Sequence, residues 1–418
     1  MMFKVFANAW KVPDIRKKLF YAFLIVAIYR LACHIPLPFM NLNALQQYKL
    51  GENTNTFYAI LIGGGIGTVA KMGIGPYITS SIIMQLLTVA IPPLEQLQKE
   101  GEEGRKKINQ ITRIVAVALS VIQGIGEVYS IHTLFSYQNI LVYITAVVSM
   151  VTGTIIIMWL SELLTEKAIG NGSSFIIFAN ILSGLPAGVR YMYMSIDLAN
   201  WVSIAKVAAV LVIFVALVAF VIYIQDGERR VPITYSKKMV GRQMYGGSSS
   251  FIPIKVNIAG VMSIIFAISL LQFPQVLNGF FNNPTLENIV NILNISEPVG
   301  ALLYVFLIFC FTFFYTSFAI NPIEIAENLK KNGGVIPAIR PGKPTSDFIQ
   351  TSIDRLSWIG ALFYAIIAMI PVIVGWTLQM ELGVGGTTLL IVTGVALEIM
   401  KQLESQLLMR HYKGFLEQ

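Results

Sequence analysis

The chain has 418 residues, of which 55% are hydrophobic and only 12% are charged, and its formal net charge is +8. Soluble domains carry about twice that charged fraction. The composition therefore excludes an ordinary water-soluble domain and indicates a polytopic membrane protein. The two cysteines, Cys33 and Cys310, lie in apolar runs, so the sequence suggests neither a disulfide framework nor a metal site.

Apolar segments long enough to cross a bilayer recur along the whole chain. The first has no small-residue cleavage site before it, so we expect it to be retained as an anchor. Ten candidate spans can be marked from apolar length. They are Leu19–Leu37, Gly73–Pro92, Ile114–Ile131, Ile140–Leu160, Ser173–Val189, Trp201–Ile224, Val256–Val276, Pro298–Ile320, Leu356–Trp376 and Gly385–Met400.

The connections between these segments alternate sharply in charge. One side of the predicted membrane receives 25 of the 30 lysines and arginines. By the positive-inside rule this side is cytosolic, which also makes both termini cytosolic. Ten spans divide into halves of five, residues 1–190 and 191–418, and an odd number in each half inverts the second relative to the first. We therefore expect an all-α protein with two inverted five-helix halves and any shared site near the midplane.

The stretch Phe57–Pro92 combines a short apolar piece, a glycine-dense break and a full span. The short piece, Phe57–Ile62, cannot cross a bilayer, and Gly63, Gly64, Gly65 and Gly67 follow it. Irregular backbone is tolerated at membrane depth only inside protein or in a watery cavity. The sequence leaves two readings open: a mobile loop outside the membrane, or a small movable element within a cavity.

Two cytosolic connections have recognisable local structure. Residues 225–255 alternate Val231, Ile233 and Tyr235 with polar residues and turn near Gly241, which predicts a two-stranded ribbon. Asn321–Asn332 predicts a short helix that Asn321 caps, and prolines then rigidify a loop that presents Arg340. The cations of these loops suit either anionic lipid headgroups or a docking surface, and the shaped loops favour docking.

Residue patterns that would support catalysis or ion-coupled transport are missing from the sequence. There is no HExxH, GxSxG or Walker loop, which argues against an enzyme. A coupled transporter should hold ionisable groups near the midplane, whereas Glu127, Glu162 and Glu398 fall near span ends. Arg30 lies inside the first span, where it either pairs with a neighbour or has a direct role. An inverted-repeat secondary solute transporter nevertheless stays open as an alternative function.

Six long motifs, in order along the chain, carry a resemblance to a known family. They are GPYITSSIIMQLL (75–87), EGEEGRKKI (100–108), TEKAIGNGSS (165–174), NPIEIAENLKKNGG (321–334), IPAIRPG (336–342) and GGTTLLIV (385–392). Together they resemble the bacterial SecY family, the channel subunits of the Sec protein translocon. The resemblance covers essentially the whole chain.

The resemblance implies a clamshell of two five-helix halves around an hourglass pore, closed by a re-entrant plug helix at about residues 54–71. Residues of this sequence match the positions of a pore ring and of the plug in that family. The ring is Ile74, Ile78, Ser173, Ile177, Ile265 and Ile391, and the plug includes Phe57, Tyr58, Ile60, Leu61, Ile62, Gly63, Gly64 and Gly65. Ser173 departs from the usual bulky aliphatic residue. Without the resemblance, ordinary packing would be the default interpretation of these isoleucines.

The family also implies a lateral gate and a set of partners. Thr79 and Gln123 match polar gate positions between spans two and three on one side and spans seven and eight on the other. Arg340 matches the cytosolic arginine that the family uses with its motor or ribosome partner. The cations of the cytosolic loops complete the predicted partner-binding set: Lys237, Lys238, Arg242, Lys330 and Lys331. The implied partners are SecE and SecG, the ATPase SecA, the ribosome, signal peptides, nascent polypeptides and anionic lipids, with no cofactor. The expected activity is passage of unfolded polypeptides across the bacterial cytoplasmic membrane and sideways release of transmembrane segments.

Overall fold

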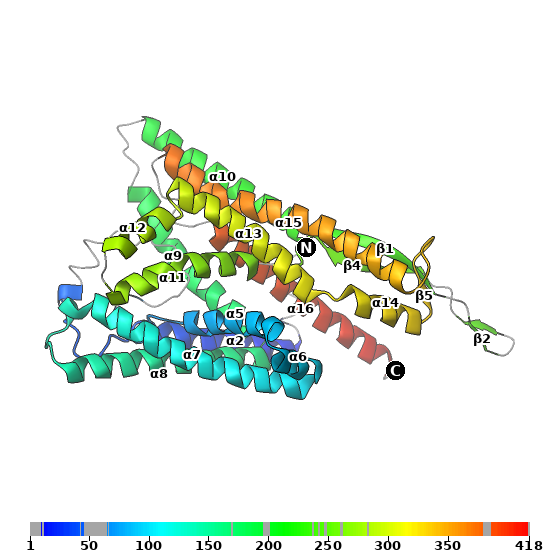
Figure 1. Ribbon diagram of the computed structural model, residues 1–418, viewed down its shortest axis with the longest axis horizontal. Helices are drawn as coiled ribbons and strands as arrows, with labels where there is room; N and C mark the ends of the chain where they lie inside the picture. Colours follow the sequence, from blue (N-terminus) through cyan, green and yellow to red (C-terminus); the bar gives the residue numbers. More distant parts are fainter. Residues whose placement is uncertain are drawn as a thin grey trace. The chain divides into compact units, whose positions relative to one another are not determined.

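A computed structural model of the protein describes residues 10, 12–41, 43–45, 65, 67–168, 170–194, 201–235, 238–240, 243–245, 249–259, 262–281, 284–378 and 386–416. The described part of the chain is mostly helical (Figure 1). Its contacts divide it into two compact units. The first unit consists of Met1–Ser203, Gln272–Val290 and Glu381–Gln418, and the second of Ile204–Leu271 and Asn291–Met380.

The first unit is built from long helices that pack side by side. Its elements are α2 (Pro13–Ala32), α5 (Gly75–Ala90), α6 (Pro92–Lys99), α7 (Glu102–Ser130), the 3₁₀ turn η1 (His132–Leu134), α8 (Ile140–Lys167), α9 (Gly172–Met194) and α16 (Gly386–Leu416). α7 packs against α5 and α8, α8 also packs against α2 and α9, and α9 packs against α16 (Figure 1). The predicted halves, residues 1–190 and 191–418, are defined by membrane topology and not by packing. The two packed units therefore do not test them, and the halves stay a prediction.

A sharp corner joins α5 to α6 and is set by proline and glycine. A residue before proline avoids the helical region, and Ile91 has φ −112° and ψ 109°, so the chain bends by 101° there. The return into α7 passes through Gly101 at φ +79°, a conformation that favours glycine. Gly104 then lies so close to α6 that a Cβ would be 1.7 Å from the Leu97 carbonyl oxygen.

The second unit pairs helices that carry aromatic side chains. It contains α13 (Pro298–Ala319), α14 (Pro322–Lys331), α15 (Lys343–Leu378) and most of α10 (Trp201–Gln225), while α11 (Met262–Phe281) and α12 (Pro284–Leu293) are divided between the units. α13 packs along α15, where the rings of Phe309 and Phe313 meet Trp358 edge-on at centroid distances of 5.9 and 5.1 Å.

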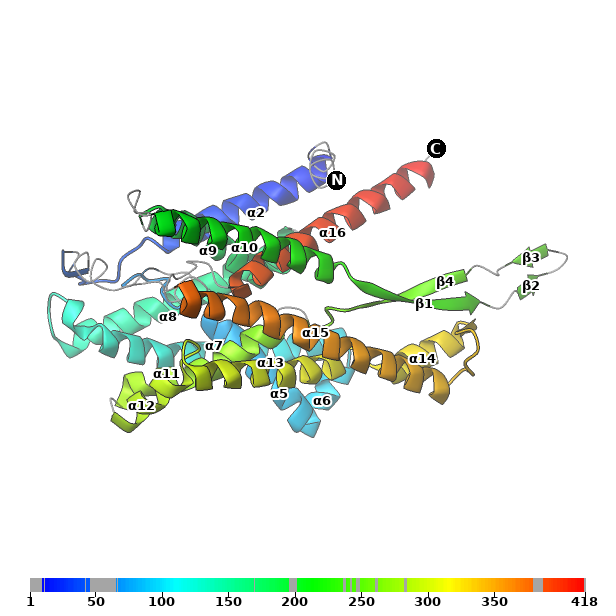
Figure 2. The same cartoon turned by 90° about the horizontal axis from the view of Figure 1, so that it is seen from above.

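A small antiparallel sheet continues from the end of α10 (Figure 2). β1 (Glu228–Tyr235) pairs with β4 (Ser249–Lys255) and with β5 (Gly334–Val335), and their order is β4-β1-β5. β2 (Lys238–Val240) pairs with β3 (Gln243–Tyr245) further along the same ribbon. The predicted two-stranded ribbon is therefore confirmed, and Val231 and Ile233 are both buried, as their alternation predicts.

Each of the ten predicted spans overlaps a helix. Within the described ranges, five helices are long and apolar enough to cross a membrane, and the bent pair α5–α6 would make a sixth. The predicted spans in α9 and α11 correspond to shorter apolar helices, Gly172–Pro186 and Met262–Leu271. The structure thus supports a multi-pass helical membrane protein, and the count of ten spans stays a prediction.

Candidate functional site

Most of the candidate ring isoleucines are buried, and they come from different helices. Ile74, Ile177, Ile265 and Ile391 are at most 6% exposed, and Ile78 is half-buried. Ile74 immediately precedes α5, whereas Ile177 and Ile391 lie on α9 and α16, two helices that pack together. Ile265 lies in the second unit. Isoleucine side chains carry no polar atoms, so each of these residues is suited to an apolar constriction.

Ser173, the sixth candidate, lies at a tightly built junction between α8 and α9. Its hydroxyl lies 3.1 Å from that of Ser161, and the Gly172 amide donates to Thr165 Oγ1 at 2.9 Å. A Cβ at Gly172 would lie 1.8 Å from the Ser161 carbonyl oxygen, so only glycine fits this approach. Ser173 therefore fixes the start of α9 on α8, a role that the sequence pattern alone did not indicate.

The predicted plug falls mainly outside the described residues. Of its named positions, Phe57, Tyr58, Ile60, Leu61, Ile62, Gly63 and Gly64 lie outside the described ranges, and only Gly65 is described. The carbonyl of Gly65 accepts hydrogen bonds from both the amide and the hydroxyl of Thr68.

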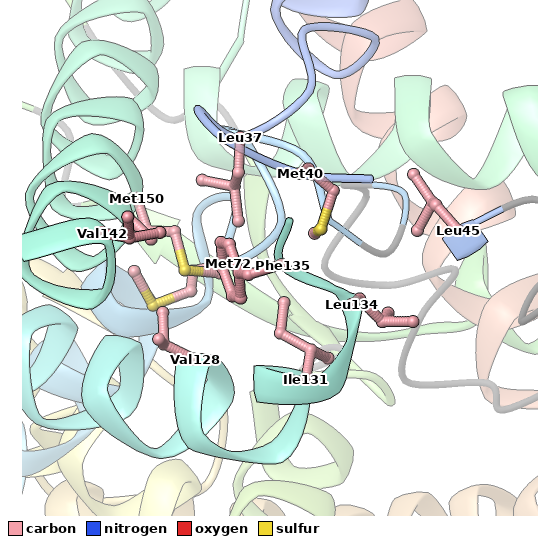
Figure 3. Close-up of a cluster of buried hydrophobic side chains, with 11 residues drawn as sticks. Leu37, Met40, Leu45, Met72, Val128, Ile131, Leu134, Phe135, Val142 and Met150 are labelled. Carbon is pink, nitrogen blue, oxygen red and sulfur yellow. The ribbon is translucent and has the colours of Figure 1, made fainter. Parts of the chain in front are cut away.

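The chain before the predicted plug and the last residues of the plug itself are held by an outer cap, which we define as residues 35–45 without residue 42, 67–72 and 131–136. Backbone hydrogen bonds join its three parts: Leu37 to Gly67, Val69 to Ile35, and Asn41 to Leu134. An apolar cluster lies within this cap and extends into α7 and α8 (Figure 3). Its buried members are Leu37, Met40, Leu45, Met72, Val128, Ile131, Leu134, Phe135, Val142, Ala146 and Met150.

Two further contacts fix residues 67–72 against α7 and α8. Lys71 forms an ion pair with Glu127 at 3.4 Å, and both side chains are partly exposed. Gly153 of α8 faces the backbone of Val69 so closely that a Cβ would lie 2.2 Å from the Val69 carbonyl oxygen. The close backbone approach constrains the geometry more than the partly exposed ion pair, whose contribution to stability should be small.

The two predicted gate residues lie on neighbouring helices of the first unit. Thr79 is half-buried on α5 and donates to the Gly75 carbonyl oxygen at 3.2 Å, and Gln123 is half-buried on α7. α5 and α7 are also joined by Ser80, whose hydroxyl donates to the Thr112 carbonyl oxygen at 2.6 Å. Because Thr79 and Gln123 are only half-buried, both side chains are partly exposed at the surface of the first unit.

A second apolar core lies under the sheet and defines what we call the ribbon module: β1, β4, β5, α14 and residues 343–356 of α15. Its packing gives the loops a fixed shape although they lie outside the predicted spans. The buried members are Val231, Ile233, Ile254, Leu329, Ile336, Ile349, Ile353 and Leu356. Asn321 caps α14 as predicted, because its side chain accepts hydrogen bonds from the amides of Ile323 and Glu324.

The loop that carries Arg340 is shaped by its backbone. Ala338 has φ +68° and Gly342 has φ +103°, both in the left-handed region. The buried hydroxyl of Thr345 donates to the Arg340 carbonyl oxygen at 2.9 Å, while the Arg340 side chain is exposed. The backbone of Arg340 is therefore anchored and its guanidinium faces outward.

The structure describes only some of the other candidate docking cations. Lys330 and Lys331 are exposed at the end of α14, and Lys238 lies in β2. Lys237 and Arg242 lie outside the described residues. The sequence analysis did not single out Arg230, which lies 4.9 Å above the Phe251 ring and also pairs with Glu228 at 2.7 Å.

Comparisons with known proteins identify the family. The SecY family model matches residues 68–400. A protein named protein translocase subunit SecY, from Streptomyces scabiei, is 41% identical over 441 aligned residues and is covered completely, together with 99% of this chain.

Solved structures share the fold at low sequence identity. A structure titled "The structure of a protein conducting channel" has a TM-score of 0.67 at 18% identity, with 95% of this chain and 96% of that chain covered. Sec61 in a canine ribosome-channel complex has a TM-score of 0.64 at 17% identity, with the same coverage. The motifs, the fold and the full-length relative agree, and the chain belongs to the SecY family.

Proposed function

We propose that this protein is the channel subunit of a bacterial Sec translocon, which passes unfolded secretory polypeptides across the cytoplasmic membrane. The observation that carries the proposal is the full-length relationship to a protein translocase subunit. Buried isoleucines at the matching ring positions add physical support. A pore for arbitrary sequences should offer no charge that would hold some substrates, and an apolar constriction resists ions when poorly wetted.

The membrane arrangement that we propose has ten spans, with both termini in the cytosol and two inverted halves at residues 1–190 and 191–418. Exposed aromatic residues near the ends of two predicted spans support the span positions, because tryptophan and tyrosine concentrate at membrane interfaces. Trp358 and Trp376 of α15 are both exposed, and 18 residues of helix separate them by about 27 Å. On α10, Trp201 and Tyr223 are separated by about 33 Å. Both distances suit a hydrocarbon core of about 30 Å.

In this proposal the plug at about residues 54–71 closes the outer side of the ring. The outer cap supports it, since Leu45, which precedes the plug, and Gly67, near the end of the plug, belong to the same packed region and would hold these two parts of the chain together. Thr79 and Gln123 would contribute to the lateral gate, through which an apolar segment of about 20 residues could enter lipid.

The ribbon module would be the cytosolic docking surface. Its apolar core keeps the anchored Arg340 loop in a fixed shape, which lowers the ordering cost of binding. The proposed partners at this surface are SecA and the ribosome, and the similarity to Sec61 in a ribosome-channel complex supports the second. SecE, SecG and anionic lipids would complete the assembly in the membrane, and signal peptides would open it.

Reconstitution into liposomes tests the proposal against the solute-transporter alternative. We expect passage of a signal-bearing precursor only when SecE, SecG and SecA with ATP are supplied, and no uptake of small solutes by the protein alone. Uptake of a solute without any partner, together with no precursor transport, would contradict the channel.

A further inference from the structure

Three polar side chains of α2 and α9 meet in the first unit, within predicted spans. The Tyr29 hydroxyl donates to Asn180 Oδ1 at 2.5 Å, and Arg30 Nη1 donates to the same oxygen at 3.3 Å. Tyr29 and Asn180 are almost completely buried, at 0% and 2% exposure. One amide oxygen of α9 therefore receives two donors from α2, and we call these three residues the polar clamp.

The surroundings make this contact specific. In an apolar interior a lost polar partner is costly, so breaking the clamp takes the Asn180 acceptor from the buried Tyr29 hydroxyl and removes one partner of the half-buried Arg30 guanidinium. Hydrogen bonds between membrane helices are modest individually, but two that share one oxygen fix both the height and the rotation of α9 relative to α2. Among the described residues, Asn180 Nδ2 has no hydrogen-bond partner, so only the oxygen of this amide contributes to the clamp.

The clamp is the second of two polar attachments along α9. The first is the junction at Gly172 and Ser173, which fixes the start of the helix on α8. Ile177 lies four residues after Ser173 and three before Asn180, which places it one helical turn from each attachment. The rotation of α9 at Ile177 is thus determined from both sides.

We propose that Tyr29, Arg30 and Asn180 are positioning residues that hold Ile177 in the closed pore ring, an inference that rests on the proposed channel function. The clamp holds α9 against α2 in the idle channel. Loosening it lets α9 rotate or shift, withdraws Ile177 from the ring and allows water and ions into the constriction.

Two nearly isosteric substitutions at position 180 should act in opposite directions. Asn180→Leu removes the acceptor that joins Tyr29 and Arg30 to α9, so we expect idle ion conductance to rise about three- to tenfold. Asn180→Asp keeps an acceptor for both donors, adds attraction to Arg30 and removes the unpartnered amide nitrogen. We expect its conductance to equal or fall below that of the parent.

The experiment measures idle conductance in planar bilayers and export of a precursor with a defective signal sequence. Tyr29→Phe, which removes only a hydroxyl, should give a smaller increase in the same direction and serves if the leucine variant fails to fold. Ser183→Ala is the matched control, because the Ser183 hydroxyl donates to the Asn180 carbonyl oxygen of its own helix at 2.7 Å. Ser183→Ala should behave as the parent.

An additional variant, Ile177→Asn, distinguishes failure of this inference from failure of the ring assignment. Suppose that Ile177→Asn raises idle conductance but Asn180→Leu and Tyr29→Phe have the same idle conductance as the parent. The clamp then does not position Ile177 and the inference is overturned. If Ile177→Asn itself remains tight, the ring assignment fails at this position and the inference fails with it. A leak with leucine that is absent with aspartate supports the clamp.

Discussion

Replacing Gly153 with alanine should separate α8 from the last residues of the predicted plug. The added Cβ would lie 2.2 Å from the Val69 carbonyl oxygen and 2.9 Å from its carbonyl carbon. These are backbone atoms and cannot rotate away, so one element must shift by about 1 Å to restore ordinary contact. Overpacking of this kind costs about 1–3 kcal/mol, which corresponds to about a 5- to 150-fold change in a two-state ratio.

Thermal unfolding of the purified protein and idle conductance in planar bilayers measure this effect. We expect Gly153→Ala to lower the unfolding midpoint and to raise conductance, since Val69 belongs to the outer cap that holds the end of the plug. The control is Gly375→Ala in the last turn of α15, where an added Cβ meets nothing within 4 Å. That change should be neutral or slightly stabilising. Parent-like stability and conductance in Gly153→Ala would refute the reasoning.

Three further substitutions test separate parts of the account. Ile391→Asn buries an amide in an apolar site at a cost of about 1–3 kcal/mol, so it should raise idle conductance and permit export with defective signals; an unchanged leak would make Ile391 ordinary packing. Arg340→Glu should leave the fold intact but weaken SecA binding and precursor transport by charge reversal, and unchanged affinity would remove its docking role. Asn321→Ala should destabilise the start of α14 by about 1 kcal/mol, visible as faster amide hydrogen exchange there, and unchanged exchange would show that the cap is dispensable.

The helices and the ribbon could be predicted because each depends on a local pattern. Apolar length located the spans, the alternation of Val231 and Ile233 located the ribbon, and Asn321 followed by Pro322 located the start of α14. The prolines that follow Asn332, by contrast, predict a stiff loop, whereas the last of them, Pro344, lies in the first turn of α15, which begins at Lys343. Proline is common in the first helical turn, so Pro344 could have indicated the start of α15, and its assignment to the loop was wrong.

The candidate site could be predicted only in part, because much of it depends on contacts between distant segments. Nothing near Tyr29 in the sequence indicates that its hydroxyl meets Asn180, 151 positions away. Similarly, Gly153 appears as one glycine in an apolar helix until Val69 is seen against it. The ring and gate positions came from the family resemblance, since periodicity does not distinguish a pore isoleucine from a packed one.

Site-specific photo-crosslinking tests the central claim most directly, namely that a polypeptide passes through this protein along the isoleucine ring. A photoreactive amino acid would be placed at position 177 and, as a control, at position 358, where Trp358 is exposed on α15. A precursor arrested during SecA-driven transport should crosslink at position 177 and not at position 358, and only when its signal sequence and ATP are present. Transport with no crosslink at position 177, or equal crosslinking at both positions, would contradict the account.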